Sequence, residues 1–305
     1  MKGFNGIMDQ ITRSHYELTY EVNFLKQKGN SFQDFFYNIM ELRYPCDFNS
    51  VRTWGNQGDQ KCDGYLTTQG TIFQVYAPNE MEATKAIKKI DEDFHGAKEH
   101  WKERMKSWIF IHNSAIGLSA EVLKKIIDLR TANPTIQIKT WGSSELHDIV
   151  FSLDPEQMLR LFGPAPTNAT MNNLGYDEIQ TVLKEVIIGE PNDDADLTPV
   201  SVEKLHFNEI STDVENLIRG GMRKSYLVQQ YFEQCYDPGF GEKNATAFKK
   251  RYLDLKSAGL SPNLIFKQLQ EFVGGSCRRG PESESAILAV LAYFFEQCDI
   301  YERPV

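Results

Sequence analysis

The chain has 305 residues, of which 41% are hydrophobic and 25% are charged. These are ordinary values for a globular protein, so the composition excludes a disordered chain and allows one or two domains. The formal net charge of −9 argues against general attraction to nucleic acid. No apolar run approaches the roughly 20 residues of a membrane helix, and the first residues lack the apolar core of a signal peptide, so we expect a cytoplasmic protein with no membrane segment.

Apolar residues at helical spacing predict two helices at the start of the chain. The first covers about residues 6–27 and offers a surface for packing or for association between copies, so a homo-oligomer is one expectation. The second begins near Ser31 and ends before Pro45. A strand at about residues 50–54 follows it and leads into a glycine-containing loop.

A β-hairpin is predicted next, because residues 62–67 and 71–77 are rich in strand-forming side chains and flank a polar turn. Alternation across a strand places Gln74 and Tyr76 on one face. If the loop is Thr68-Gln69, Asp63 lies opposite Gln74; if it is Gln69-Gly70, Asp63 lies opposite Tyr76. With a three-residue loop, Asp63 would no longer share a face with Gln74 and Tyr76.

After the hairpin, periodicity predicts a long helix ending near Trp101 and a strand over residues 108–112. A helix capped by Ser119 and a strand over residues 135–140 then form a β-α-β unit that extends the sheet in parallel. Two shorter helices, at about residues 144–151 and 155–161, complete this α/β part. We therefore predict an α-β-β-β-α-β core with a mixed sheet.

The residues beyond a linker at 163–168 predict an all-helical second domain, with helices from about 176, 211, 222, 243, 261 and 282. Glycine pairs at 220–221 and 274–275 indicate helix ends. Between Glu190 and Glu215, eight acids stand against the single base Lys204, which makes this segment either a contact surface or a solvated loop. The predicted domains are residues 1–163 and 164–305.

The hairpin sequences carry a resemblance. The motif GDQKCDGY, followed by IFQVYAP, and the element order resemble restriction-endonuclease-like nucleases of the PD-(D/E)xK superfamily. Together with a later YFEQ, FKKRYLDL and IFKQL series, they resemble the C-terminal component of bacterial ABC-three-component systems. This resemblance implies an antiphage effector that works with an ABC ATPase and a middle component.

The resemblance also implies a site for phosphodiester hydrolysis. Asp63 takes the place of the metal-binding Asp at the start of the central strand, and Gln74 takes the acidic position of the second half-motif. Carboxylate and amide oxygens suit Mg²⁺ or Mn²⁺, which would polarise the phosphoryl group of DNA. Glu41 on the first core helix and Asp59 in the glycine loop are additional candidate ligands; a solvated position for Glu41 and a loop hydrogen-bonding role for Asp59 are the simpler alternatives.

Tyr76 departs from the superfamily, which usually has Lys at this position. A phenol supplies no positive charge at neutral pH, so we expect Lys85 or Lys89 on the following helix to replace the motif lysine. The main hypothesis is a metal-dependent DNA endonuclease that acts as a defence effector. The alternative is a nuclease fold that has lost catalysis and binds DNA or protein within a multiprotein complex.

The sequence lacks the motifs of several other catalytic classes. There is no G-x-x-x-x-G-K-[ST] loop, so this chain is not expected to be the ATPase itself. The motifs G-x-S-x-G and H-E-x-x-H are absent as well. Five cysteines without a C-x-x-C pair argue against a disulfide framework or a zinc site.

Overall fold

The computed structural model describes residues 8–51, 60–186, 204, 207–235, 239–275, 280–297 and 300–302. Packing divides the chain into two units. Asn23–Leu161 form the first, which we call the α/β unit, and Met1–Val22 join Phe162–Val305 in the second, which we call the helical unit. The functional domains at 1–163 and 164–305 stay a prediction.

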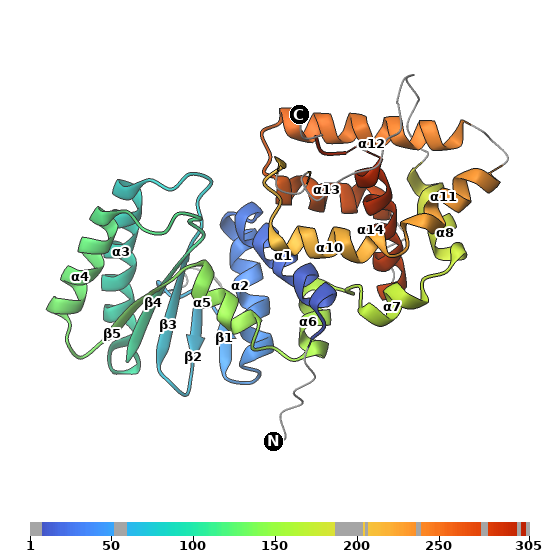
Figure 1. Ribbon diagram of the computed structural model, residues 1–305. Helices are drawn as coiled ribbons and strands as arrows, with labels where there is room; N and C mark the ends of the chain where they lie inside the picture. Colours follow the sequence, from blue (N-terminus) through green and yellow to red (C-terminus); the bar gives the residue numbers. More distant parts are fainter. Residues whose placement is uncertain are drawn as a thin grey trace. The chain divides into compact units, whose positions relative to one another are not determined.

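A mixed sheet lies between two layers of helices in the α/β unit (Figure 1). The chain enters this unit from α1 (Gln10–Lys26). The elements that follow are α2 (Gly29–Arg43), β1 (Phe48–Ser50), β2 (Gly64–Leu66), β3 (Thr71–Tyr76), α3 (Ala83–Trp101), η2 (Lys102–Arg104), β4 (Ser107–His112), α4 (Ala120–Ala132), β5 (Gln137–Trp141), α5 (Ser143–Val150) and α6 (Pro155–Phe162).

The described strands are ordered β1-β2-β3-β4-β5 in the sheet. β2 is antiparallel to both β1 and β3, whereas β3, β4 and β5 run parallel to one another. The predicted α-β-β-β-α-β order and the parallel extension are therefore confirmed. The strand expected at 50–54 is shifted, because β1 ends at Ser50 and residues 52–59 lie outside the described ranges.

Helices cover both faces of the sheet, which explains why β4 is buried along its whole length. On one face, Phe73 contacts Phe36 of α2 and Trp141, with ring centroids 5.5 and 5.3 Å apart. On the other face, Trp108 packs edge-on against Phe94 of α3 at 5.4 Å, in a core that also includes side chains of α4. We call these the α2 face and the α3 face.

The hairpin of β2 and β3 has one of the predicted registers. Gly64 pairs with Phe73 and Leu66 pairs with Thr71. In the same register, Asp63, one residue before Gly64, lies level with Gln74, one residue after Phe73. This is the arrangement expected for a loop at Thr68-Gln69. Gly70 closes the turn at φ +61°, where a Cβ atom would lie 2.8 Å from the Arg104 carbonyl oxygen.

The helical unit is all-α in its described residues, as predicted. Its helices after residue 162 are α7 (Asn168–Asn173), α8 (Tyr176–Val186), α10 (Thr212–Met222), α11 (Ser225–Gln234), α12 (Phe240–Ser257), α13 (Pro262–Gly274) and α14 (Pro281–Glu296). α14 lies at the centre of the core and is buried from Glu284 to Ala292. Most of the acid-rich segment, residues 190–203, lies outside the described residues.

No helix in the described part of the chain is long and apolar enough to cross a membrane.

Candidate active site

Asp63 lies just before β2 and is 7% exposed. Its backbone N–H donates to the Phe73 carbonyl oxygen at 2.9 Å. Among the contacts of its carboxylate with described residues, Gln33 Nε2 of α2 donates to Oδ1 at 2.7 Å, and the Val75 N–H of β3 donates to Oδ2 at 2.7 Å. The carboxylate is thus fixed between α2 and β3, directly beside the backbone of Gln74.

Gln74 lies in the middle of β3 and is 3% exposed. It pairs with Phe110 of β4, so both side chains point to the α3 face. Its Oε1 has no hydrogen-bond partner among the described atoms. An amide oxygen that is buried without a donor is costly, so this position favours a ligand, a water or an ion that the protein would bind there.

Asp63 and Gln74 are adjacent in the hairpin, but their side chains have different directions. The Asp63 carboxylate is held by α2, whereas Gln74 points to the α3 face. Their oxygens are of the kind that Mg²⁺ prefers, and Mg²⁺ keeps several waters when it has few protein ligands. Within the described residues, no three His, Cys, Asp or Glu side chains form a group suited to a metal ion. A shared ion at Asp63 and Gln74 requires a side-chain rotation that brings both oxygens to one face.

Tyr76 stands two residues after Gln74 on the same face, with its ring 5.7 Å from that of Phe110. Burial raises the pKa of the Tyr76 phenol, against a smaller lowering by the charge of Lys85. The phenol therefore stays neutral at pH 7 and cannot replace a lysine charge. The charge of Lys85 is thus close enough to Tyr76 to act on the pKa of the phenol.

The two candidate lysines of α3 differ in their surroundings. Lys85 is largely exposed and pairs with Glu82 at 2.6 Å, and this hydrogen bond raises the Lys85 pKa. Lys89 bonds to Asp93, whose side chain is fully buried and also pairs with Lys61 at 3.1 Å. Because moving Lys89 would leave a buried carboxylate with one partner fewer, Lys85 is the more available of the two.

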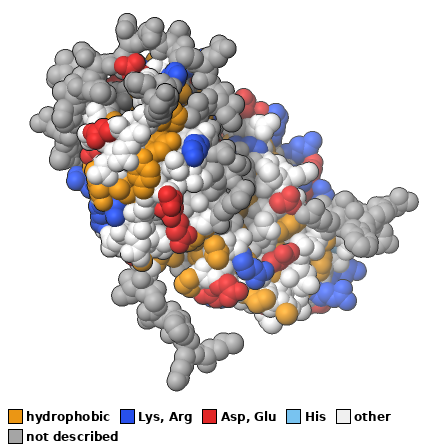
Figure 2. Space-filling view, turned by 90° about the vertical axis from the view of Figure 1, so that its right-hand side faces the viewer, with side chains coloured by type: hydrophobic (Ala, Val, Ile, Leu, Met, Phe, Trp, Pro, Cys, Tyr) orange, Lys and Arg blue, Asp and Glu red, His pale blue; other side chains and the backbone are white. Residues whose placement is uncertain are grey.

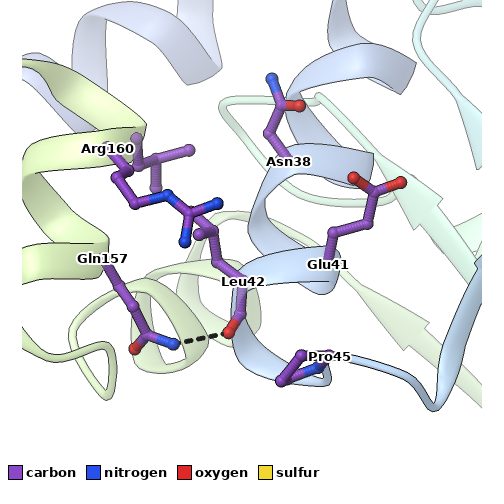
Figure 3. A pocket seen from close by; sticks show the side chains of 7 residues that line it. Asn38, Glu41, Leu42, Pro45, Gln157 and Arg160 are labelled. Carbon is purple, nitrogen blue, oxygen red and sulfur yellow. Dashed lines mark hydrogen bonds between the residues drawn. The ribbon is translucent and has the colours of Figure 1, made fainter.

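Glu41 lies away from Asp63. It is eight residues along α2 from Gln33, which corresponds to about 12 Å of helix. There it lines a pocket of about 350 Å³, towards which the Arg160 side chain extends from α6 (Figure 3). Gln157 closes one side by donating to the Leu42 carbonyl oxygen at 2.7 Å. The structure agrees with the simpler expectation that Glu41 is solvated, and Asp59 lies outside the described residues.

Gln33 was not identified from the sequence as a site residue. It occurs between the apolar Phe32 and Phe35 of α2 and has no motif around it. Its partner is 30 residues away in the chain, so only the tertiary structure brings the two together.

Comparison with known families concerns the helical unit. Residues 177–302 match the family model described as C-terminal domain 10 of the ABC-three component (ABC-3C) systems. The match runs from the first turn of α8 to beyond α14 and supports the predicted membership of an ABC-three component system. No curated protein and no solved structure matches the chain.

The ABC-three component match covers about two fifths of the chain and begins at residue 177. Every predicted catalytic residue lies before this point. The family match therefore concerns the helical unit alone, and the chemistry of the α/β unit has to be inferred from the geometry of that unit.

Proposed function

We propose that the chain is the effector of an ABC-three component defence system in the cytoplasm, and that its α/β unit is a metal-dependent DNA endonuclease. The observation that carries this proposal is the fixed Asp63 carboxylate, which lies at the start of β2 beside Gln74, whose buried amide oxygen has no described partner. A carboxylate and an uncommitted amide oxygen on neighbouring strands are what a hard divalent ion would use.

Mg²⁺ or Mn²⁺ would supply Lewis-acid polarisation of the phosphoryl oxygen and an activated water. In this proposal Asp63 and Gln74 would hold the ion after the Asp63 carboxylate leaves Gln33 and turns to the face of Gln74. Lys85 places a positive charge near the developing negative charge of the transition state, the role that Tyr76 cannot fill. Lys89 stays with Asp93 and supports the fold of α3.

Plasmid cleavage tests the proposal. The full chain is incubated with supercoiled DNA and Mg²⁺ or Mn²⁺, alone and with the proteins encoded by neighbouring genes. We expect Asp63→Ala to lower the cleavage rate by about 10³-fold, because metal-borne charge stabilisation is worth several kcal/mol. The exposed Asp128 of α4 provides the matched control, and Asp128→Ala should cut like the wild type. Metal-independent cutting, or equal cutting by both variants, would contradict the assignment.

Lys85 gives a second functional prediction. We expect Lys85→Gln to lower the rate by about 10²-fold, the effect of removing one group that stabilises transition-state charge, and Lys85→Arg to retain most activity. Lys88→Gln is the control, because Lys88 is exposed on the same helix and its ion pair with Glu92 is long, at 3.8 Å. Full activity of Lys85→Gln would exclude Lys85 as the replacement for the motif lysine.

A second candidate function is DNA or protein binding without catalysis. The different directions of Asp63 and Gln74, and the neutral Tyr76, favour it. This alternative predicts binding of DNA that is unchanged by chelation of divalent ions and by Asp63→Ala. Binding without cutting in the plasmid assay would select it over the endonuclease.

The helical unit is proposed to bind the partner ATPase and middle component. Large apolar side chains are exposed on it at Phe207, Tyr226 and Leu253, each about half accessible to solvent. Figure 2 shows hydrophobic side chains gathered on one face of the molecule. Exposed aromatic and leucine side chains are typical anchors of protein interfaces.

A further inference from the structure

The N-terminus of α5 has features of an anion-binding site that the proposed catalysis does not use. We propose that His112, at the end of β4, and the first turn of α5 together bind a phosphate group, which belongs to nucleic acid or to a small phosphorylated compound. Binding there needs neither a metal ion nor cleavage of DNA. The inference therefore goes beyond the proposed function and can fail independently of it.

This site lies at the carboxyl ends of the parallel strands. β4 ends at His112, and β5 ends at Trp141, directly before Gly142 and α5. In open α/β sheets, ligands bind outside these strand ends, and helices that begin there direct their N–H groups at anions. His112 also pairs with Tyr76 of β3, so the phosphate would lie next to the strand that carries Gln74 and Tyr76.

His112 supplies a hydrogen-bond donor to this site. The side chain is 5% exposed, and its Nδ1 accepts the Ser114 N–H at 3.3 Å, so the neutral ring carries its proton on Nε2. In the part of the chain that the structure describes, Nε2 makes no hydrogen bond. Burial lowers the pKa of the imidazole, and the charge of Glu145 raises it by less, which keeps the ring neutral at pH 7. The Nε2–H group is therefore available to an acceptor on a ligand.

Gly142 allows this imidazole to approach the start of the helix. A Cβ atom on Gly142 would lie 2.9 Å from His112 Cε1 and 3.2 Å from Nε2, so the ring packs directly on the residue before the first turn. The first N–H groups of a helix have no acceptor within it, and Gly142 has no side chain to cap them. The N–H of Ser144 has no acceptor among the described residues, and its side chain is exposed. Nε2–H and the Ser144 N–H can therefore donate to one phosphate.

Glu145 is the charge that opposes an anion here. Its Oε2 accepts the Gly142 N–H at 2.8 Å, and its negative charge acts on the pKa of His112. Glu145 can keep this bond when phosphate binds, because His112 Nε2 and the Ser144 N–H are separate donors. Like charges repel at this distance, so Glu145 lowers the affinity for phosphate. Removal of its charge should strengthen binding, an effect that a structural role of this helix end would not produce.

Titration of the full chain with inorganic phosphate in EDTA tests the proposal. The NMR signals of the Ser144 amide and the His112 ring are followed at constant pH, with chloride at equal ionic strength as the control. We expect saturable shifts with phosphate and none with chloride. A short DNA duplex is the second arm: if it shifts the same signals, the phosphate belongs to nucleic acid, and if only inorganic phosphate does, the ligand is a small phosphorylated compound. No saturable shift in either arm would overturn the proposal.

Two substitutions of His112 separate phosphate binding from a structural role. Gln places its amide near the position of Nε2, whereas Asn places its amide near Nδ1 and keeps only the acceptor for the Ser114 N–H. We expect His112→Asn to weaken phosphate binding by about 10- to 100-fold, the effect of losing a hydrogen bond to a charged group, and His112→Gln to bind within about 3-fold of the wild type. A structural role predicts the reverse order, and that result would contradict the assignment of Nε2.

Glu145→Gln changes the charge of the site and retains an acceptor for the Gly142 N–H, since Gln also serves at this position of a capping box. We expect the affinity for phosphate to rise by about 2- to 5-fold, the size of a charge effect at a helix end. Glu156→Gln is the matched control, because Glu156 is an exposed acid in the first turn of α6, and it should leave the affinity unchanged. Unchanged or weaker binding by Glu145→Gln would show that phosphate does not bind at the N-terminus of α5.

Discussion

Gly221→Ala is expected to destabilise the helical unit by about 3 kcal/mol, which would lower its melting temperature by about 6–12 °C. α10 passes α14 closely at this residue. A Cβ atom on Gly221 would lie 2.2 Å from the Leu288 carbonyl oxygen and 2.9 Å from Ala292 Cβ. Because the first of these is a backbone atom of a buried helix, the clash is relieved only by moving α10 and α14 apart. Thermal unfolding followed by circular dichroism measures the effect.

Gly220 provides the matched control one residue earlier. A Cβ atom there would meet the end of the Ile11 side chain, with Cδ1 at 2.9 Å, and a side-chain end can rotate away. Alanine is favoured over glycine within a helix by about 1 kcal/mol, so we expect Gly220→Ala to be close to neutral. Equal melting temperatures for the two variants would show that α10 and α14 are not in the close contact that the structure describes.

The same glycine pair shows where sequence reasoning fails. The pair at 220–221 was expected to end a helix, since glycine is common at helix ends. A helix does end here, since α10 stops at Met222, but both glycines lie within its last turn and pack closely against neighbouring side chains and backbone. The expectation was correct for residues 274–275, where Gly275 follows the last residue of α13 with φ +41°. A glycine that permits close packing and a glycine that ends a helix are identical in the sequence of one chain.

The candidate site was predictable only in part. Strand propensity and the polar turn predicted the hairpin, and the pairing of β2 with β3 placed Asp63 level with Gln74. The direction of the Asp63 side chain was not predictable, because positive φ angles at Gln60 and Lys61 turn the chain just before β2. Alternation along the strand does not extend through such a turn.

Lys204 is a second case in which local sequence misleads. It is the single base among the eight acids of the segment Glu190–Glu215, and the sequence predicted this segment to be a contact surface or a solvated loop. The structure buries it completely in the helical unit. Its ammonium group donates to the carbonyl oxygens of Phe295 and Ile300 at 2.7 Å each, and lies 4.3 Å from the centre of the Phe295 ring. These acceptors are some 90 residues away and are invisible to a local pattern.

Lys204→Met is therefore expected to destabilise the helical unit by about 2–4 kcal/mol. Methionine fills a similar volume, but the carbonyl oxygens of Phe295 in α14 and of Ile300 beyond it lose the Lys204 donor. A buried acceptor that loses its donor costs about 1–3 kcal/mol. The relief from no longer burying a charge offsets part of this cost. Denaturant unfolding, compared at equal m-values, measures the difference.

Lys256→Met is the matched control, because it removes a positive charge from the helical unit without removing a buried contact. Lys256 makes an exposed ion pair with Glu302 in the same C-terminal region, and exposed pairs contribute little to stability. We expect this variant to unfold at the same denaturant concentration as the wild type. Because Lys204 joins the end of α14 to Ile300, its loss should also raise amide hydrogen exchange at residues 295–297 and 300–302, while exchange in α10 changes less. Unchanged exchange there, together with wild-type stability, would show that the Lys204 contacts do not hold the end of α14 in solution.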